Sequence, residues 1–125
     1  MNTITLEQLI TFHKKIINST GGSDGIRDRS LLESAIFKAE QTFDGQDLYV
    51  GVVKKTSVIA FSLIKNHGFI DGNKRVGVAV LLLLLKINGL QIRYTQQELI
   101  EIGLKTAEGL LNEEDIESWI MRHQV

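Results

Sequence analysis

The stretch from Val76 to Ile87 constrains the fold more than any other feature, because it is apolar on every side of a helix except at Gly77 and Lys86. A helix without a polar face is covered on all sides by other elements. Its longest apolar run, Val76 to Leu85, is far shorter than the ~20 residues that span a bilayer. The chain has no proline, so glycines and capping residues set its helix ends. We therefore expect an all-α fold around this buried central helix.

Apolar spacing and capping patterns predict five further helices. Thr5 with Gln8 and Thr95 with Glu98 indicate capping boxes. The predicted helices run over about Leu6–Ile17, from Asp28 or Ser30 to Ile36, over Leu48–Asn66, Asn73–Ile87 and Thr95–Glu108, and from Asn112 through Ile120, with loops at Gly21–Gly25 and Gln41–Asp47 and a brief extended segment at Gln91–Tyr94. No repeat or linker interrupts this pattern. Residues 1–125 are therefore expected to form a single domain, a compact six-helix bundle.

Composition narrows the classes of partner and compartment. Lys plus Arg total 14 and Asp plus Glu total 15, so the net charge of -1 gives no electrostatic reason to expect nucleic acid or an anionic membrane as partner. The absence of cysteine excludes disulfides and thiolate metal sites. Met1 to Glu7 lacks the basic and apolar pattern of a signal peptide. A cytoplasmic protein is expected.

The residues with evident chemistry gather in the segment from His67 to Arg75, which reads His-Gly-Phe-Ile-Asp-Gly-Asn-Lys-Arg. It precedes the start of the central helix, where unpaired N–H groups and the helix dipole favour an anion. Gly72 permits close approach of a ligand, and Asn73 carries an amide that can donate to phosphate oxygens. Lys74 and Arg75 add two positive charges. The segment is therefore a candidate phosphate-binding loop.

Two residues of this segment have roles beyond phosphate binding. Asp71 is an anion beside a site that favours anions. A bridging Mg²⁺ would explain this placement, because Mg²⁺ binds one or two carboxylates together with phosphate oxygens. Histidine is the side chain best suited to exchange a proton near neutral pH, so His67 is the candidate general base for an attacking hydroxyl. Phe69 is expected to anchor the loop in the core.

Taken singly, these residues have structural interpretations as well. Asp71 and Asn73 are each common as helix caps, and Lys74 and Arg75 are each common as solvated charges; only their conjunction favours a site. Outside the segment, His13 lies on an apolar helix face and is expected to be a hydrogen-bonded core histidine. His123 is expected to be a solvated residue at a helix end. No histidine or carboxylate set has the spacing of a dedicated zinc or iron site.

The segment resembles the His-x-Phe-x-Asp/Glu-Gly-Asn-x-Arg signature of the Fic/Doc superfamily, and more closely the Doc (death-on-curing) toxins. The resemblance extends to other parts of the chain: Gly21-Gly22, Gly25-Ile26-Arg27-Asp28, Leu32-Glu33-Ser34-Ala35, Asn88-Gly89 and Ile116-x-x-Trp119-Ile120. It implies an α-helical Fic/Doc fold and ATP-dependent modification of a target hydroxyl. Most Fic proteins transfer AMP, whereas Doc toxins transfer the γ-phosphate to a threonine of elongation factor Tu and halt translation.

Carried over by position, the resemblance assigns each residue of the loop a role. His67 is the base, Asp71 the Mg²⁺ ligand, and the phosphate cradle comprises Gly72, Asn73, Lys74 and Arg75. The implied cofactors are ATP and Mg²⁺. The implied partners are a cognate antitoxin and a translation factor similar to elongation factor Tu.

Two departures from the Fic signature separate the possible activities. Lys74 stands where Fic adenylyltransferases usually have glycine, and Val78 where they have a second arginine. Both match the Doc branch and favour a kinase-type phosphotransferase toxin. The alternatives are a Fic-type nucleotidyltransferase, which would attach AMP to a protein hydroxyl, and a non-catalytic partner-binding module.

The inhibitory helix of many Fic proteins, Ser/Thr-x-x-x-Glu-Gly/Asn, is incomplete in this chain, since Gln8 follows Thr3 to Glu7. Inhibition is therefore expected from an antitoxin, through a helical segment in an apolar groove near the loop. Residues Gln41 to Asp47 are candidates for docking the target.

Overall fold

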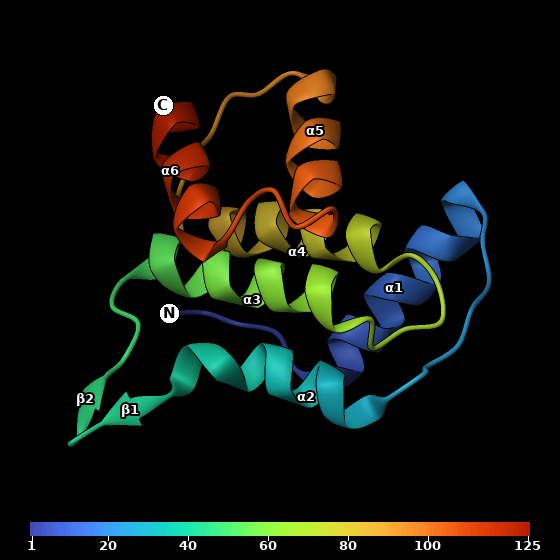
Figure 1. Cartoon of the computed structure of the whole chain (residues 1–125), viewed down its shortest axis with the longest axis horizontal. Helices are drawn as coiled ribbons and strands as arrows, with labels where there is room; N and C mark the ends of the chain where they lie inside the picture. The colour runs from blue at the N-terminus through green and yellow to red at the C-terminus, as the bar shows by residue number, and fades with distance from the viewer.

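The computed structural model describes all 125 residues, which form helices apart from one short hairpin and the connecting loops (Figure 1). The elements are α1 (Leu6–Thr20), α2 (Arg29–Phe37), the 3-10 turn η1 (Lys38–Glu40), β1 (Thr42–Phe43), β2 (Gln46–Asp47), α3 (Val52–Asn66), α4 (Asn73–Ile87), α5 (Gln96–Ala107) and α6 (Glu113–His123). The predicted all-α, six-helix bundle is confirmed. No helix combines the length and the apolar character that crossing a membrane would require.

The helix starts follow from capping side chains. Both predicted boxes form: the Thr5 and Thr95 hydroxyls accept from the N–H groups three residues later, and the side chains of Gln8 and Glu98 return the bond. Asp28, rather than Ser30, caps α2. These bonds satisfy N–H groups that have no partner within the helix.

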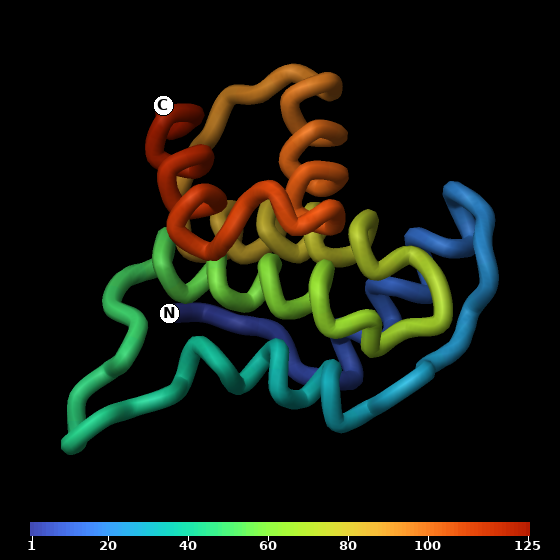
Figure 2. Tube along the Cα trace, in the orientation of Figure 1, coloured from blue at the N-terminus to red at the C-terminus, as the bar shows by residue number.

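The antiparallel pair α3 and α4 forms the centre of the bundle, with α1 and α2 on one side and α5 and α6 on the other (Figures 1 and 2). One apolar cluster joins the central pair to α1 and α2, with Leu9, Leu32 and Leu84 fully buried. A second joins it to α5 through Ile102 and to α6 through Ile116 and Ile120. The loop between α3 and α4 is thereby held on a rigid support.

The covering of α4 is less complete than its apolar sequence predicts. Its face toward α3 is buried, but Val78, Ala79 and Leu82 are only half-buried. They line a groove of about 250 Å³ between α4 and α5. The more enclosed helix is α3, which packs against α2, α4, α5 and α6. The expectation that α4 is buried on all sides is therefore corrected: one side faces this groove.

Two boundaries near the start of α3 also differ from the prediction. The helix begins at Val52 rather than Leu48, because Gly51 has a φ of 92° that a helix does not allow. The segment Gln41–Asp47, expected as a loop, contains the hairpin of β1 and β2. Its turn is Asp44-Gly45, both with positive φ, which is a favoured two-residue hairpin turn.

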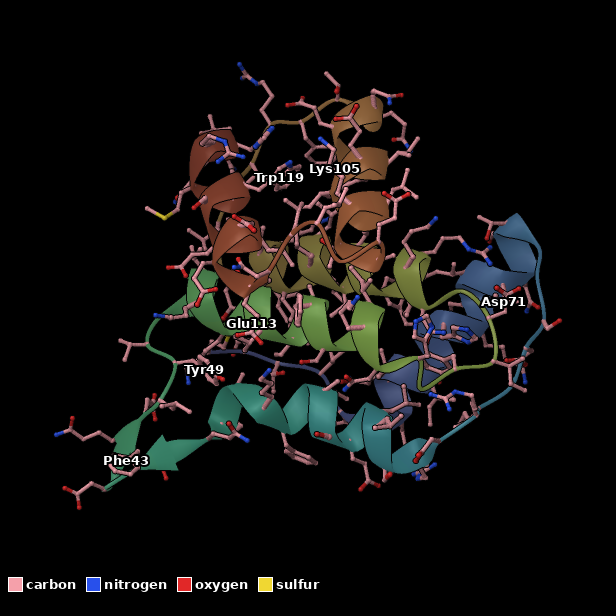
Figure 3. The ribbon with its side chains drawn as sticks, in the orientation of Figure 1. Phe43, Tyr49, Asp71, Lys105, Glu113 and Trp119 are labelled. Atoms are coloured by element: carbon pink, nitrogen blue, oxygen red, sulfur yellow. The ribbon has the colours of Figure 1, made fainter.

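The hairpin lies far from the candidate site. Phe43 on the hairpin and Asp71 in the loop after α3 occupy opposite ends of the molecule (Figure 3). The 15 residues of α3 separate them, which corresponds to about 22 Å of helix. Gln41–Asp47, the candidate segment for docking the target, therefore lies away from the loop.

The C-terminus closes the second half of the bundle. The predicted extended segment at Gln91–Tyr94 is confirmed in part by a bridge between Ile92 and Gln124. His123 is not the solvated residue that was expected: Nε2 lies 2.5 Å from a carboxylate oxygen of Glu98, and the ring stacks on Trp119. It ties α6 to the start of α5.

Candidate active site

The loop between α3 and α4 is anchored by the extended segment that follows α1. Ile26 and Phe69 form an antiparallel bridge. Three flanking backbone hydrogen bonds of 2.8–3.1 Å run from the N–H of Ile70 to the carbonyl of Gly25, and from the N–H groups of Arg27 and Asp28 to the carbonyl of Gly68. The glycine-rich segment that resembles the Doc upstream region is therefore part of the site.

His67 ends α3 in the left-handed conformation, with φ 52° and ψ 49°, which is strained for a residue with a Cβ. Arg27 stabilises this end: Nε donates to the carbonyl of His67 at 2.6 Å, and a terminal nitrogen donates to that of Asn66 at 3.0 Å. His67 is exposed. Sequence reasoning assigned Arg27 no role in positioning His67.

Asn73 has a loop-closing role in addition to the one predicted. Its side-chain oxygen accepts from the N–H of Phe69, and its side-chain nitrogen donates to the carbonyl of Phe69, both at 3.0 Å. The side chain is 7% exposed. The amide oxygen and one N–H of the amide nitrogen are thus bound to Phe69, and Asn73 closes the loop. Burial leaves the second N–H of this nitrogen little access to a ligand.

Asp71 is held as a carboxylate at the mouth of the loop. One oxygen accepts from the N–H of Ser23 at 3.1 Å and the other from the N–H of Gly72 at 2.8 Å. These two bonds, with the guanidinium of Arg75 3.7 Å away, hold the pKa of Asp71 below its ordinary value. The side chain is about half exposed, so it is ionised and open to a cation.

The two cations at the start of α4 differ in freedom. Arg75 donates to the hydroxyl of Thr20 at 2.5 Å and to the carbonyl of Gly21 at 2.7 Å, which fixes it against the end of α1. Lys74 is exposed, and it lines the groove between α4 and α5. Arg75 is thus fixed by side-chain hydrogen bonds, whereas Lys74 is the exposed charge.

Gly72 supplies the turn into α4. Its φ of 80° favours glycine, and a Cβ there would lie 3.0 Å from Cδ1 of Ile17 and 3.3 Å from Nε2 of His13. After it come the first N–H groups of α4, which have no acceptor in the preceding turn of helix. His67, Asp71, Lys74 and Arg75 therefore flank a helix N-terminus suited to an anion.

Comparison with known proteins identifies the family of this chain. A model of the Fic/DOC family matches residues 3–85, which include the whole loop. The chain belongs to the Fic/DOC family. It is similar to "Toxin Doc" of Mycolicibacterium smegmatis, with 34% identity over 93 residues that cover 74% of this chain and 67% of that protein. It is also similar to "Protein kinase doc" of Escherichia phage P1, with 25% identity over 122 residues, 98% of this chain and 95% of the phage protein.

The carboxylates of this Fic/DOC chain suit only one kind of metal site. No three His, Cys, Asp or Glu side chains gather as a metal site. Mg²⁺ is commonly held by one or two carboxylates with the substrate's phosphates, and the ionised, half-exposed Asp71 fits that arrangement.

His13 is 1% exposed and bonded to the loop, which confirms the prediction of a satisfied core histidine.

Proposed function

We propose that this protein is the toxin of a toxin–antitoxin pair, a Doc-like kinase that transfers the γ-phosphate of ATP to a hydroxyl of a translation factor similar to elongation factor Tu. Membership of the Fic/DOC family and similarity to proteins named as a toxin and as a protein kinase support this. The observation that carries it is the exposed imidazole of His67 at one end of a loop whose other end holds Asp71, Lys74 and Arg75 at a helix N-terminus.

The residues of the chain divide the work of the proposed reaction. A ring nitrogen of His67 takes the proton of the target hydroxyl while that oxygen forms a bond to the γ-phosphorus. The bond from this phosphorus to the oxygen bridging to the β-phosphate breaks, and ADP leaves with the electron pair. Lys74, Arg75 and the N–H groups at the start of α4 stabilise charge on the phosphate oxygens.

Mg²⁺ held by Asp71 and the phosphates would supply further neutralisation of that charge. Asp71 contributes a carboxylate whose position is set by Ser23 and Gly72. Asp71→Asn should therefore weaken both the Mg²⁺ dependence and nucleotide binding.

Phosphoryl transfer is favoured over AMP transfer by the two departures from the Fic signature. Lys74 places charge at the start of α4, and its stem lies against α5, where a Cβ at Gly103 would come within 3.1 Å of Cγ of Lys74. Val78, one turn later, lines the same groove and offers no polar group. A phosphate chain therefore meets its charged contacts near His67, which favours presentation of the terminal phosphate.

An isotopic experiment distinguishes the activities. The purified chain, ATP and Mg²⁺ are incubated with a bacterial lysate, with label on either the α- or the γ-phosphate. We expect a single labelled protein near the size of an elongation factor, from γ-labelled ATP only. Label from α-labelled ATP would instead identify a nucleotidyltransferase, and label from neither would favour a non-catalytic module.

Two sets of variants make this experiment specific. His67→Ala should fold and bind ATP but lose on the order of 10²–10⁴ in rate, and undiminished growth arrest by this variant would exclude His67 as the base. Lys74→Gly combined with Val78→Arg should shift labelling toward the α-phosphate if these residues set the orientation of ATP.

We place the antitoxin in the groove between α4 and α5. The groove is apolar along Leu82, Leu99 and Ile100, and it ends at Lys74 and Arg75. An amphipathic helix with an acidic residue at that end matches both its lining and its charge. Bound there, it would neutralise the cations that the proposed reaction uses.

A surface substitution tests this placement. Ile100 is 53% exposed on the groove, and Ile100→Glu should still arrest growth but escape neutralisation by the co-encoded antitoxin. Met121, 61% exposed on α6 and outside the groove, provides the matched control as Met121→Glu. Equal neutralisation of both variants would place the antitoxin elsewhere.

A further inference from the structure

His13 is a buried polar side chain that the proposed reaction does not use. It lies within α1 with 1% of its surface exposed, and its Nε2 is 2.6 Å from the carbonyl oxygen of Asp71. Because a carbonyl oxygen only accepts, Nε2 carries a proton and donates it. The ring also stacks on Phe69, with centroids 3.7 Å apart and planes inclined by 2°. A single residue of α1 thus contacts the loop in two ways.

The hydrogen bond from His13 fixes the orientation of the peptide unit between Asp71 and Gly72. In a trans peptide the C=O and N–H groups point in opposite directions, and the chain has no cis peptide bond. With the carbonyl turned toward the buried ring, the N–H of Gly72 points the other way, where it donates to the carboxylate of Asp71 at 2.8 Å. Reversal of this peptide unit would break both bonds and turn the carbonyl oxygen toward the carboxylate.

The local sequence does not enforce this orientation by itself. Gly72 accepts positive and negative φ about equally, so the backbone at this position permits the peptide to rotate. The first N–H groups of α4 follow directly, and an inward-facing N–H with an outward-facing oxygen would place negative charge beside a helix N-terminus that favours an anion. A restraint from outside the loop is therefore needed, and His13 is the side chain that contacts this carbonyl.

We propose that His13 is a positioning residue that locks the peptide between Asp71 and Gly72, and through it the carboxylate of Asp71, in the orientation that binds cation and phosphate. The proposal rests on the proposed function for its effect on catalysis. The lock itself is a property of the folded chain and is measurable without nucleotide or target.

Three variants separate the hydrogen bond from packing. His13→Gln keeps an N–H donor, His13→Leu has similar size without a donor, and His13→Phe keeps the stacked ring without a donor. We expect the amide ¹H–¹⁵N resonance of Gly72 to shift or broaden in the Leu and Phe variants and to remain closer to wild type in the Gln variant. His123→Phe makes the same change at a hydrogen-bonded histidine on α6 and should leave this resonance unchanged.

The rate of phosphate transfer from γ-labelled ATP should change in the same variants as the Gly72 resonance. The Leu and Phe variants should lose about tenfold or more in kcat, as expected when one positioning hydrogen bond is lost, and the Gln variant should recover a large part of it. An unchanged Gly72 resonance and rate in the Phe variant would overturn the proposal, as would a Gln variant no better than Leu. If wild type transfers no phosphate yet the resonance responds as described, the proposed function fails while the lock stands.

Discussion

Replacement of Asn73 by alanine distinguishes a loop-closing role from a ligand-binding role for this residue. Its side chain is the hydrogen-bond partner of both the N–H and the carbonyl of Phe69, a residue that is itself only 1% exposed. Alanine removes both partners at once and introduces no polar atom in their place. The backbone of Phe69 is then left with two buried groups that nothing in the chain satisfies.

The cost of Asn73→Ala follows from these two groups. A buried donor or acceptor left without its partner costs about 1–3 kcal/mol, so the variant with two such groups should lose about 2–6 kcal/mol of unfolding free energy. For a chain of this size, that corresponds to a fall in Tm of about 10–20 °C. The loss of the loop's closure should also reduce activity, but only as a consequence of the looser fold.

Thermal and urea unfolding, followed by circular dichroism, measure the loss of stability. Calorimetry measures nucleotide binding by the same variants. Lys74→Ala is the control, because the neighbouring exposed side chain should change stability by less than about 0.5 kcal/mol while weakening nucleotide binding. A stable Asn73→Ala variant with weakened ATP binding would refute the reasoning and restore the amide as a phosphate ligand.

Three further changes have defined outcomes. Gly77→Ala should cost about 1–3 kcal/mol, since its Cβ would lie 2.4 Å from Cγ1 of Ile64; an unchanged urea midpoint would show that α3 and α4 separate freely. The pair with His123 lowers the pKa of Glu98 from 4.5 to about 2. The stabilisation that this pair gives the fold is therefore present above pH 4.5 and is lost as pH falls toward about 2. Glu98→Gln should flatten the decline of Tm over that range, and parallel curves of Tm against pH for wild type and variant would contradict this. Arg27→Ala should lose about 1–2 kcal/mol and more activity than stability explains, because the end of α3 is released; full activity would show that this restraint is unnecessary.

Much of this fold was predictable because its signals are local. The capping boxes at Thr5 and Thr95 formed as expected, since each depends on residues three positions apart. The start of α4 at Asn73 was likewise marked by the glycine before it. The hairpin at Gln41–Asp47 was missed although its Asp44-Gly45 turn has a recognisable sequence, because its strands are only two residues long.

The candidate site was likewise predictable only where its signals are local. The types of residue in the segment, a histidine and a carboxylate before the central helix and two cations in its first turn, could be recognised from nine consecutive positions. Which of these residues face a ligand could not be recognised from the sequence. The amide of Asn73 turns inward to Phe69, and Arg75 is held by Thr20 and Gly21, whereas Lys74 stays free.

The sequence by itself determined the helices, the family signature and the chemical groups of the loop, because spacing along the chain fixes which residues share a helix face or a turn. Only the tertiary structure decided the orientation of that loop. Arg27 contacts the end of α3 from 40 positions away and His13 contacts Asp71 from 58 positions away. Contacts of such separation depend on how α1 and the segment after it pack on α3 and α4, and this packing is set by the whole apolar core rather than by any local pattern.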